Sequence, residues 1–359
     1  MSKAKRIIFF SIVALLFIAF IVVPLIDNVG VKEDEETAET LAEFSFKENL
    51  AMYLGNVVTI KAKVFSDDVD KLEVVLQDSV IHTWLKPSNE VSFDFNSSTY
   101  LLGAKEIKLN IYKGGSLVSE DSRLLRILSD EKPLKLKATV VALTPHNTTH
   151  FTQGLEFNNN VLYESTGQNG ESKVAKIDMK TGEPLLKIGL DANYFGEGIT
   201  VLGNRVYQIT WKEQRCFIYN KETLQIEKDI NYAGEGWGLC NDGKNLLMSD
   251  GSERIYYRNP ETFELLKTIE VYDNQGPRIR LNELEYINGK IYANVWMENI
   301  ILVIDPSNGK VLGEIDCSDV VLKAKGMGEV LNGIAYNPLT NKTYLTGKFW
   351  SKIAEVTIK

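Results

Sequence analysis

The sequence predicts an all-β chain in which a five-bladed β-propeller follows an immunoglobulin-like β-sandwich and an N-terminal transmembrane helix. Three observations lead to this fold class. An apolar run fills residues 7–26, short alternating strand patterns fill residues 44–130, and a repeat with the period of a propeller blade fills residues 131–359. With 359 residues the chain is long enough for more than one domain.

Residues 1–30 form the expected membrane anchor or signal segment. Their core, IIFFSIVALLFIAFIVVPLI at 7–26, is almost uninterrupted apolar sequence. As a helix it would span about 30 Å, which is the thickness of a bilayer core. Lys3, Lys5 and Arg6 precede it, so the N-terminus is expected in the cytoplasm. We expect an uncleaved anchor in the cytoplasmic membrane with the bulk of the chain on the periplasmic or secreted side; a cleaved signal peptide is the alternative.

Two segments lie between the anchor and the repeats. Residues 31–43 are acidic and lack aromatic side chains, which indicates a solvated linker. Residues 44–130 alternate apolar and polar positions in the runs VVTIKAKVF, KLEVVLQ, VSFDF and KEIKLNIYKGG. This pattern predicts an antiparallel, immunoglobulin-like sandwich. Nothing in it indicates chemistry, so we expect a spacer or adhesion module.

Charge and cysteine content exclude some function classes. The net charge is −8 and no basic cluster occurs after the first residues, so nucleic acid is not an expected partner. Cys216, Cys240 and Cys317 allow at most one disulfide, and buried unpaired thiols are the favoured interpretation. No CxxC motif or His/Cys cluster predicts a zinc site.

Five segments repeat one strand pattern at intervals of 40 to 52 residues: VLYESTG, RVYQITW, NLLMSDG, KIYANVW and KTYLTGK. A short strand precedes each segment and a hairpin with a polar turn follows most of them. Each unit thus supplies about four strands, as a propeller blade does. The fifth unit lacks an outer strand, whereas LKLKATVVAL at 134–143 has no blade of its own. We expect this strand to complete the fifth blade and close the ring.

Aligned repeats also predict a site. One set of equivalent residues starts the inner strands: Gln153, Glu197, Trp237, Asn282 and Asn332. A second set ends the neighbouring strands: Gly167, Trp211, Gly251, Trp296 and Lys348. Because the paired strands are antiparallel, both sets should meet at one mouth of the central channel. A pocket with one carboxylate, several amides, tryptophans and a lysine suits a small molecule. A water-filled polar channel with tryptophans packed between blades remains the alternative.

Several other chemistries find no support. His82 lies in the sandwich. His146 and His150 fall in PHNTTH before the first blade, where a surface loop is expected and a pair of metal ligands is the alternative. No arrangement of Ser, His and Asp for nucleophilic catalysis is indicated. GEGWG and FGEG lack the strand–helix context of a nucleotide-binding loop.

Nine motifs in order resemble the plant and bacterial glutaminyl-peptide cyclotransferases of the papaya type. They are FTQGL, YESTG, FGEG, TWK, EGWGL, NELE, ANVW, NGIAY and TGKFW, and they extend over residues 135–359. The resemblance implies a five-bladed propeller. It also implies an aminoacyltransferase that converts the N-terminal Gln of peptides and proteins to pyroglutamate and releases ammonia, without a metal or other cofactor.

The resemblance assigns roles to motif residues. Glu197 would transfer the proton, and a pocket would be built by Phe151, Gln153, Phe195, Trp237, Asn282, Trp296 and Lys348. Trp211 and Asn332 join this pocket by their repeat positions. Lys348, Asn282 or Gln153 would donate hydrogen bonds to the amide oxygen during attack. A monomer is expected. A membrane-tethered propeller that only binds ligands is the alternative, and a sugar hydrolase or lyase is a third, although it would need a second carboxylate.

Overall fold

The protein is described by a computed structural model that covers residues 40–359. The expected anchor at 1–30 and most of the linker lie outside the described residues. Between residues 40 and 359, no helix is both long and apolar enough to cross a bilayer. The described chain is all-β, as predicted, apart from the helix α1 (Ser318–Ala324) and the short 3-10 helix η2 (Ser97–Thr99).

The N-terminal strands form two sheets, one with the order β1-β3-β6 and one with the order β2-β8-β7-β4-β5. Their bounds are β1 (Ala42–Phe44), β2 (Asn49–Tyr53), β3 (Val57–Val64), β4 (Lys71–Leu76), β5 (Ser79–Leu85), β6 (Glu90–Asn96), β7 (Gly103–Lys113) and β8 (Ser116–Leu128). Buried apolar side chains of both sheets, such as Ile60 and Leu109, share one cluster. The prediction of a purely antiparallel arrangement is wrong, because β2 pairs with β8 in parallel. Side chains alternate in the same way in both kinds of pairing, so the pattern alone does not distinguish them.

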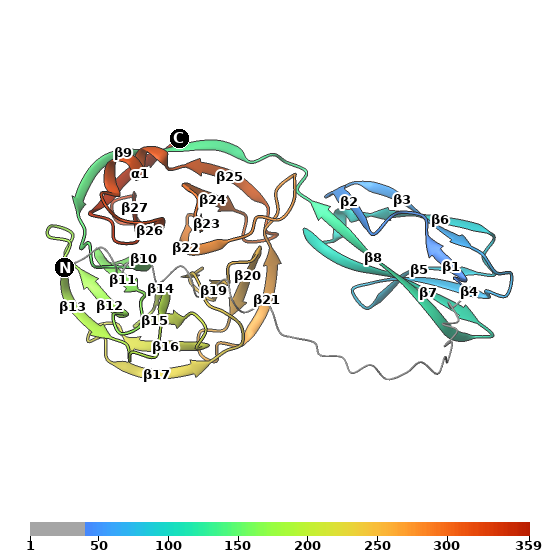
Figure 1. Cartoon of the computed structure of the whole chain (residues 1–359), viewed down its shortest axis with the longest axis horizontal. Helices are drawn as coiled ribbons and strands as arrows, with labels where there is room; N and C mark the ends of the chain where they lie inside the picture. Colours follow the sequence, from blue (N-terminus) through green and yellow to red (C-terminus); the bar gives the residue numbers. More distant parts are fainter. Residues whose placement is uncertain (1–39) are drawn as a thin grey trace, which may run out of the picture. The chain divides into compact units, whose positions relative to one another are not determined.

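The repeats fold into sets of four antiparallel strands, which Figure 1 shows arranged around a ring. Three sets are separate sheets with the orders β10-β11-β12-β13, β14-β15-β16-β17 and β18-β19-β20-β21. Their bounds are β10 (Thr152–Asn158), β11 (Val161–Thr166), β12 (Lys173–Ile177), β13 (Pro184–Gly189), β14 (Gly196–Leu202), β15 (Arg205–Thr210), β16 (Arg215–Asn220), β17 (Ile226–Asn231), β18 (Leu239–Asn241), β19 (Leu246–Ser249), β20 (Arg254–Arg258) and β21 (Leu265–Glu270).

The remaining strands form one eight-stranded sheet with the order β22-β23-β24-β25-β9-β28-β27-β26. Their bounds are β9 (Leu134–Pro145), β22 (Leu281–Ile287), β23 (Lys290–Val295), β24 (Ile300–Ile304), β25 (Val311–Asp316), β26 (Leu331–Asn337), β27 (Lys342–Gly347) and β28 (Lys352–Ile358). The predicted pairing of β9 with the last repeat is confirmed, since β9 runs antiparallel to β28. It also pairs in parallel with β25 of the preceding repeat, which was not predicted.

Apolar clusters lie between neighbouring sets and hold the ring together. The first and last sets share one cluster, which includes Leu155 of β10 and Ala335 of β26, so the ring is closed by packing as well as by β9. Burial of such side chains is the main favourable contribution to folding. The helix α1 lies between β25 and β26, and it buries Val320 and Ala324 in the cluster of the last two sets. This insertion explains why the last repeat interval is the longest.

Candidate active site

The five residues predicted at the starts of the inner strands lie at or just before these starts, and four of them lie at a β-bulge. Gln153 is on β10, Glu197 on β14, Asn282 on β22 and Asn332 on β26, while Trp237 comes just before β18. In each of these four strands, the pairing register shifts at this point. A bulge redirects a side chain out of the regular alternation. It therefore explains how polar residues at the start of a buried strand reach the channel.

Glycines next to these residues allow neighbouring inner strands to approach each other closely. A Cβ atom on Gly198 would lie 2.3 Å from the backbone nitrogen of Leu239, and one on Gly238 would lie 2.0 Å from the carbonyl oxygen of Asn282. No larger residue fits at these positions without moving the backbone. The glycine after Glu197 is thus required by the packing of the ring around the site.

The second predicted set lies at the same end of the ring. Trp211, Trp296 and Lys348 directly follow β15, β23 and β27, as expected. The two glycines of this set make room for aromatic rings instead of lining the site themselves. A Cβ on Gly167 would lie 2.3 Å from the Phe195 ring, and one on Gly251 would lie 2.7 Å from the Trp237 ring.

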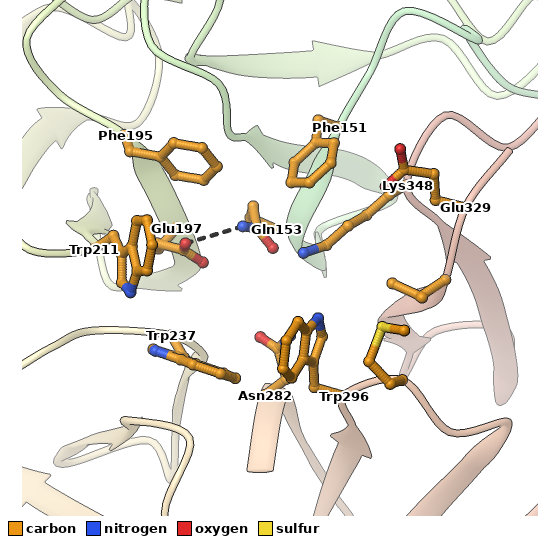
Figure 2. Close-up of a pocket in the computed structure, with 12 residues that line it drawn as sticks. Phe151, Gln153, Phe195, Glu197, Trp211, Trp237, Asn282, Trp296, Glu329 and Lys348 are labelled. Carbon is orange, nitrogen blue, oxygen red and sulfur yellow. Dashed lines mark hydrogen bonds between the residues drawn. The ribbon is translucent and has the colours of Figure 1, made fainter. Parts of the chain in front are cut away.

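These side chains surround a cavity of about 360 Å³, which Figure 2 shows in close-up. It is lined by Phe151, Gln153, Phe195, Glu197, Trp211, Trp237, Asn282, Trp296, Met297, Glu329, Val330 and Lys348. All predicted site residues except Asn332 line it. Three lining residues, Met297, Glu329 and Val330, were missed, because they lie in connecting segments outside the aligned repeat positions.

Asn332 lies behind the cavity and fixes the orientation of Gln153, so its prediction as a substrate-binding residue is corrected. Its Nδ2 donates to the backbone oxygen of Thr152 at 3.0 Å and to Gln153 Oε1 at 3.0 Å. Because a backbone oxygen only accepts, this contact sets which end of each amide donates. Gln153 must therefore direct its Nε2 at Glu197, where it donates to Oε1 at 2.9 Å (Figure 2).

Glu197 is a buried carboxyl with a raised pKa. Its side chain is 5% exposed. Burial raises the pKa of Glu197 well above its ordinary value; the positive charge of Lys348 lowers it, and the negative charges of Glu213 and Glu235 raise it further. A carboxyl whose pKa is shifted toward neutrality is suited to accept and return a proton at physiological pH.

Lys348 directs a buried ammonium group into the cavity. Its side chain is 5% exposed, and Nζ lies 4.4 Å from the centre of the Phe151 ring. Figure 2 shows Nζ pointing toward the space between Gln153 and Trp296. Burial lowers the pKa of Lys348, while Glu197 and Glu329 raise it. The amine thus supplies a mobile donor opposite the carboxyl of Glu197.

Asn282 presents an acceptor without a protein partner. Its side chain is 3% exposed and lines the cavity, and no group of residues 40–359 donates to its buried Oδ1. A buried amide oxygen left unpaired is costly, so a ligand N–H that reaches it gains a hydrogen bond. This atom marks a position for a substrate N–H group.

One carboxylate fixes two of the aromatic walls. Glu235 Oε2 accepts from Trp211 Nε1 at 2.8 Å and from Trp237 Nε1 at 3.2 Å. Trp237 also packs edge-on against Trp296, with ring centres 5.6 Å apart. No role for Glu235 was predicted from the sequence. Its position two residues before Trp237 was the available signal.

The expectation of a surface loop at His146 and His150 is wrong. Both are buried, and Glu164 bridges them: His146 Nε2 lies 3.0 Å from Oε1, and His150 Nδ1 lies 2.7 Å from Oε2. His146 Nδ1 lies 2.9 Å from the backbone oxygen of Trp350. Two acceptors flank this ring, so both nitrogens must donate and the imidazole is protonated. The ligand atoms are close enough to share a metal ion, but this hydrogen-bond pattern is that of an ion pair.

The His146–Glu164 pair lies outside the cavity but next to segments that build it. Thr152 Oγ1 donates to Glu164 at 2.7 Å, and the backbone nitrogen of Phe349 donates to His150 O at 2.7 Å. Thr152 precedes Gln153, and Phe349 follows Lys348. The pair thus joins the first and last strand sets beneath the site.

Other buried carboxylates lie deeper in the ring and do not line the cavity. Glu283 accepts from the backbone nitrogens of Leu155 at 3.3 Å and Ile334 at 2.9 Å, and thereby ties together the inner strands of separate sets. Glu283 does not line the cavity, which agrees with the alternation of side chains along β22 after Asn282. Burial raises the pKa of Glu156 to about 7.

The three cysteines, Cys216, Cys240 and Cys317, are buried and unpaired, as expected.

The fold and the cavity together define a class of protein. A concave, largely aromatic site with one buried carboxyl and several converging amides is typical of an enzyme that binds a small polar group and moves a proton on it. The chain belongs to the glutamine cyclotransferase family, whose model matches residues 116–358. The match begins at β8, before the first residue at which the motifs were found.

Two similar proteins bear names that fit this family. A glutaminyl-peptide cyclotransferase of Arabidopsis thaliana is 40% identical over 227 residues, which are 61% of this chain and 71% of that protein. The crystal structure of a glutaminyl cyclase of Myxococcus xanthus is similar with a TM-score of 0.60 and 35% identity. That similarity covers 64% of this chain and 99% of the other.

Proposed function

We propose that this protein is a glutaminyl-peptide cyclotransferase that converts the N-terminal Gln of peptides or proteins to pyroglutamate and releases ammonia. The observation that carries the proposal is the buried carboxyl of Glu197, oriented by Gln153 in an aromatic cavity of a chain that belongs to the glutamine cyclotransferase family. The activities for which both relatives are named agree with it.

Ring closure requires a proton to move between two nitrogens. The substrate's α-amine attacks its own γ-carboxamide carbon, so a C–N bond forms and the bond to the amide nitrogen later breaks. Glu197 takes a proton from the attacking amine and returns it to the leaving nitrogen, which departs as ammonia. One carboxyl performs both transfers, and its raised pKa brings its proton affinity closer to that of both nitrogens.

The amide oxygen becomes negatively charged during attack and needs donors. Lys348 Nζ points into the cavity, and the second N–H of Gln153 Nε2 is available after the bond to Glu197. Each such donor typically contributes about 3–4 kcal/mol to transition-state stabilisation. Asn282 Oδ1 would accept from a substrate N–H. The aromatic walls hold the flexible Gln side chain in the folded pose that ring closure requires.

The alternative is a module that binds ligands without turning them over. A module that only binds has no need of a buried carboxyl with a raised pKa in the same cavity as a buried lysine, which favours the enzyme. A sugar hydrolase needs two carboxyl groups at the scissile bond. The other carboxylate that lines the cavity, Glu329, is exposed, which does not favour that chemistry.

The proposal also includes the domain organisation of the chain and its location. The strand sets of residues 131–359 would be a five-bladed propeller, and residues 44–130 an immunoglobulin-like module. Residues 1–30 would anchor the chain in the cytoplasmic membrane, with the enzyme on the periplasmic or secreted side. We propose a monomer that acts on peptide substrates and has no nucleic-acid partner. We propose no cofactor, because the proton transfers above need only the chain's own residues.

The experiment is direct. The full-length chain, purified in mild detergent, is incubated with several peptides that begin with Gln. Ammonia release together with the loss of one ammonia from the peptide mass supports the proposal. Stable binding of such peptides without turnover would favour the binding module instead.

A further inference from the structure

One side of the cavity is far more exposed than the rest. Trp296 is 39% exposed and Met297 is 60% exposed, whereas Glu197 and Lys348 on the inner side are each 5% exposed. The Gln that reacts must lie deep, next to Glu197. The peptide that follows this Gln leaves toward the most exposed lining residues, so its second residue passes Trp296 and Met297.

The open side is held in place by a tight turn after β23. The backbone nitrogen of Glu298 donates to Val295 O at 3.0 Å, and that of Trp296 donates to Arg280 O at 2.8 Å. Met297, at the centre of this turn, has a φ of 67°, which is uncommon for a residue with a side chain. The turn therefore presents Met297 at the rim, next to Trp296.

Another part of the rim is built by the backbone that supports Lys348. Glu329 N donates to Lys348 O at 2.7 Å, and Lys348 N donates to Val330 O at 3.0 Å. The pairing that positions Lys348 thus also places Val330 on the cavity wall and Glu329 at its exposed edge. An apolar surface bordered by one carboxylate results.

We propose that Trp296, Met297, Val330 and Glu329 form a subsite for the side chain of the residue that follows the N-terminal Gln. The inference rests on the proposed function and adds the substrate class. A long apolar side chain at this position buries surface against Met297, Val330 and the Trp296 ring. An acidic side chain meets the like charge of Glu329 and is disfavoured.

The test compares dipeptide amides that differ only in the second residue. The full-length chain is assayed for kcat/KM of ammonia release with Gln-Gly-NH2, Gln-Leu-NH2 and Gln-Glu-NH2. The Leu substrate should exceed the Gly substrate by about tenfold, since partial burial of a Leu side chain suffices for this ratio. Met297→Ala should reduce the Leu-to-Gly ratio at least about threefold.

Two further variants make the result specific. Met327→Ala is the matched control, because Met327 is fully exposed and does not line the cavity; its Leu-to-Gly ratio should equal that of the unmodified chain. Glu329→Gln should raise kcat/KM for Gln-Glu-NH2 by about threefold relative to Gln-Gly-NH2, as expected for an exposed charge pair.

The outcomes separate this proposal from the proposed function. Release of ammonia from all three substrates with equal kcat/KM, or an unchanged Leu-to-Gly ratio in Met297→Ala, overturns the subsite and leaves the cyclotransferase standing. If ammonia is released from none of the three substrates, both the subsite and the proposed function are overturned.

Discussion

Gln153 Nε2 donates a 2.9 Å hydrogen bond to Glu197 Oε1, while Gln153 Oε1 accepts a 3.0 Å bond from Asn332. The candidate acid/base is therefore oriented by a neighbour that is itself oriented from behind. Because Asn332 is anchored to the backbone oxygen of Thr152, the direction of the whole chain of amides is determined. Tests of this relationship probe whether preorganisation of Glu197 matters for catalysis.

Replacing Asn332 should damage catalysis without removing any group from the cavity. In Asn332→Ala the Gln153 amide loses its partner and rotates, so Glu197 loses a fixed donor. We expect kcat to fall about tenfold with KM little changed, since a lost hydrogen bond to a charged group has this order of effect. Steady-state kinetics with a Gln-initiated peptide measures it. Asn337→Ala, on the same strand but outside the cavity, is the matched control. Equal kcat values in the two variants would contradict the positioning role.

Glu235 should act on substrate binding through the aromatic walls. In Glu235→Ala both indole N–H groups of Trp211 and Trp237 lose their shared acceptor. The freed rings hold the substrate less well, so KM should rise about tenfold while kcat falls less. Glu235→Gln retains an amide oxygen as acceptor and should show a smaller rise. If KM in Glu235→Ala matches that of the unmodified chain, the two tryptophans do not depend on this carboxylate.

The activity should have an acidic limit set by Glu197. Its pKa is raised by burial, and the carboxylate form must be present to accept a proton, so kcat/KM should be lost as pH falls through this raised pKa. Lys348 lowers that pKa and Glu235 raises it. The acidic limit should therefore move to higher pH in Lys348→Met and to lower pH in Glu235→Gln. Shifts in the same direction, measured on the residual activity of each variant, would be inconsistent with Glu197 as the titrating group.

The His146–Glu164 pair should stabilise the fold in a pH-dependent way. Burial alone would lower the pKa of His146, but the Glu164 carboxylate raises it above its ordinary value. Stability from this group is thus fully present below the unfolded pKa of about 6.5 and is lost as pH rises through the folded pKa. Burial alone would raise the pKa of Glu164, but the two imidazoles hold it well below its usual range. Its contribution is present above the unfolded pKa of about 4.3 and is lost only as pH falls through that low folded value.

Removing one partner of this pair leaves an uncompensated buried charge. Glu164→Gln should lower the free energy of unfolding by about 3–5 kcal/mol near pH 6, and the loss should shrink at alkaline pH. Urea unfolding at several pH values measures both effects. Glu90→Gln, which breaks the exposed pair with Lys61, is the control and should change little. A loss for Glu164→Gln that does not depend on pH would contradict a charged His146.

Repeat positions were sufficient to place the site, and the reason is geometric. Glu197 belongs to the set of residues at the inner strand starts, and Trp296 belongs to the set at the ends of the neighbouring strands. Both sets lie at one mouth because each repeat pairs these two strands in the same antiparallel way. Equivalent positions in the repeats do not show which side chain faces the cavity and which lies behind another side chain. Asn332 shares the position of Gln153 in its repeat but is covered by it, and this follows from the hydrogen bonds between strand sets.

Features made by segments distant in the chain were missed for a related reason. The pairing of β9 with β25 and the burial of His146 both depend on how the ring closes, which no local pattern encodes. Met297 and Val330 lie in connecting segments of unequal length, outside the periodic part of the repeats. A histidine next to Asn and Thr residues has the composition of a surface turn, and only the partner Glu164 makes its burial favourable.

The central claim is that Glu197 carries the proton in ring closure, and Glu197→Gln tests it most directly. The variant keeps the shape of the side chain but cannot take up a proton, so kcat for ammonia release from a Gln-initiated peptide should fall about 100- to 10,000-fold. Glu222→Gln, which changes an exposed carboxylate outside the cavity, should retain kcat within about threefold. A kcat for Glu197→Gln within about tenfold of the unmodified chain would contradict the account, because general acid–base catalysis is worth more than that.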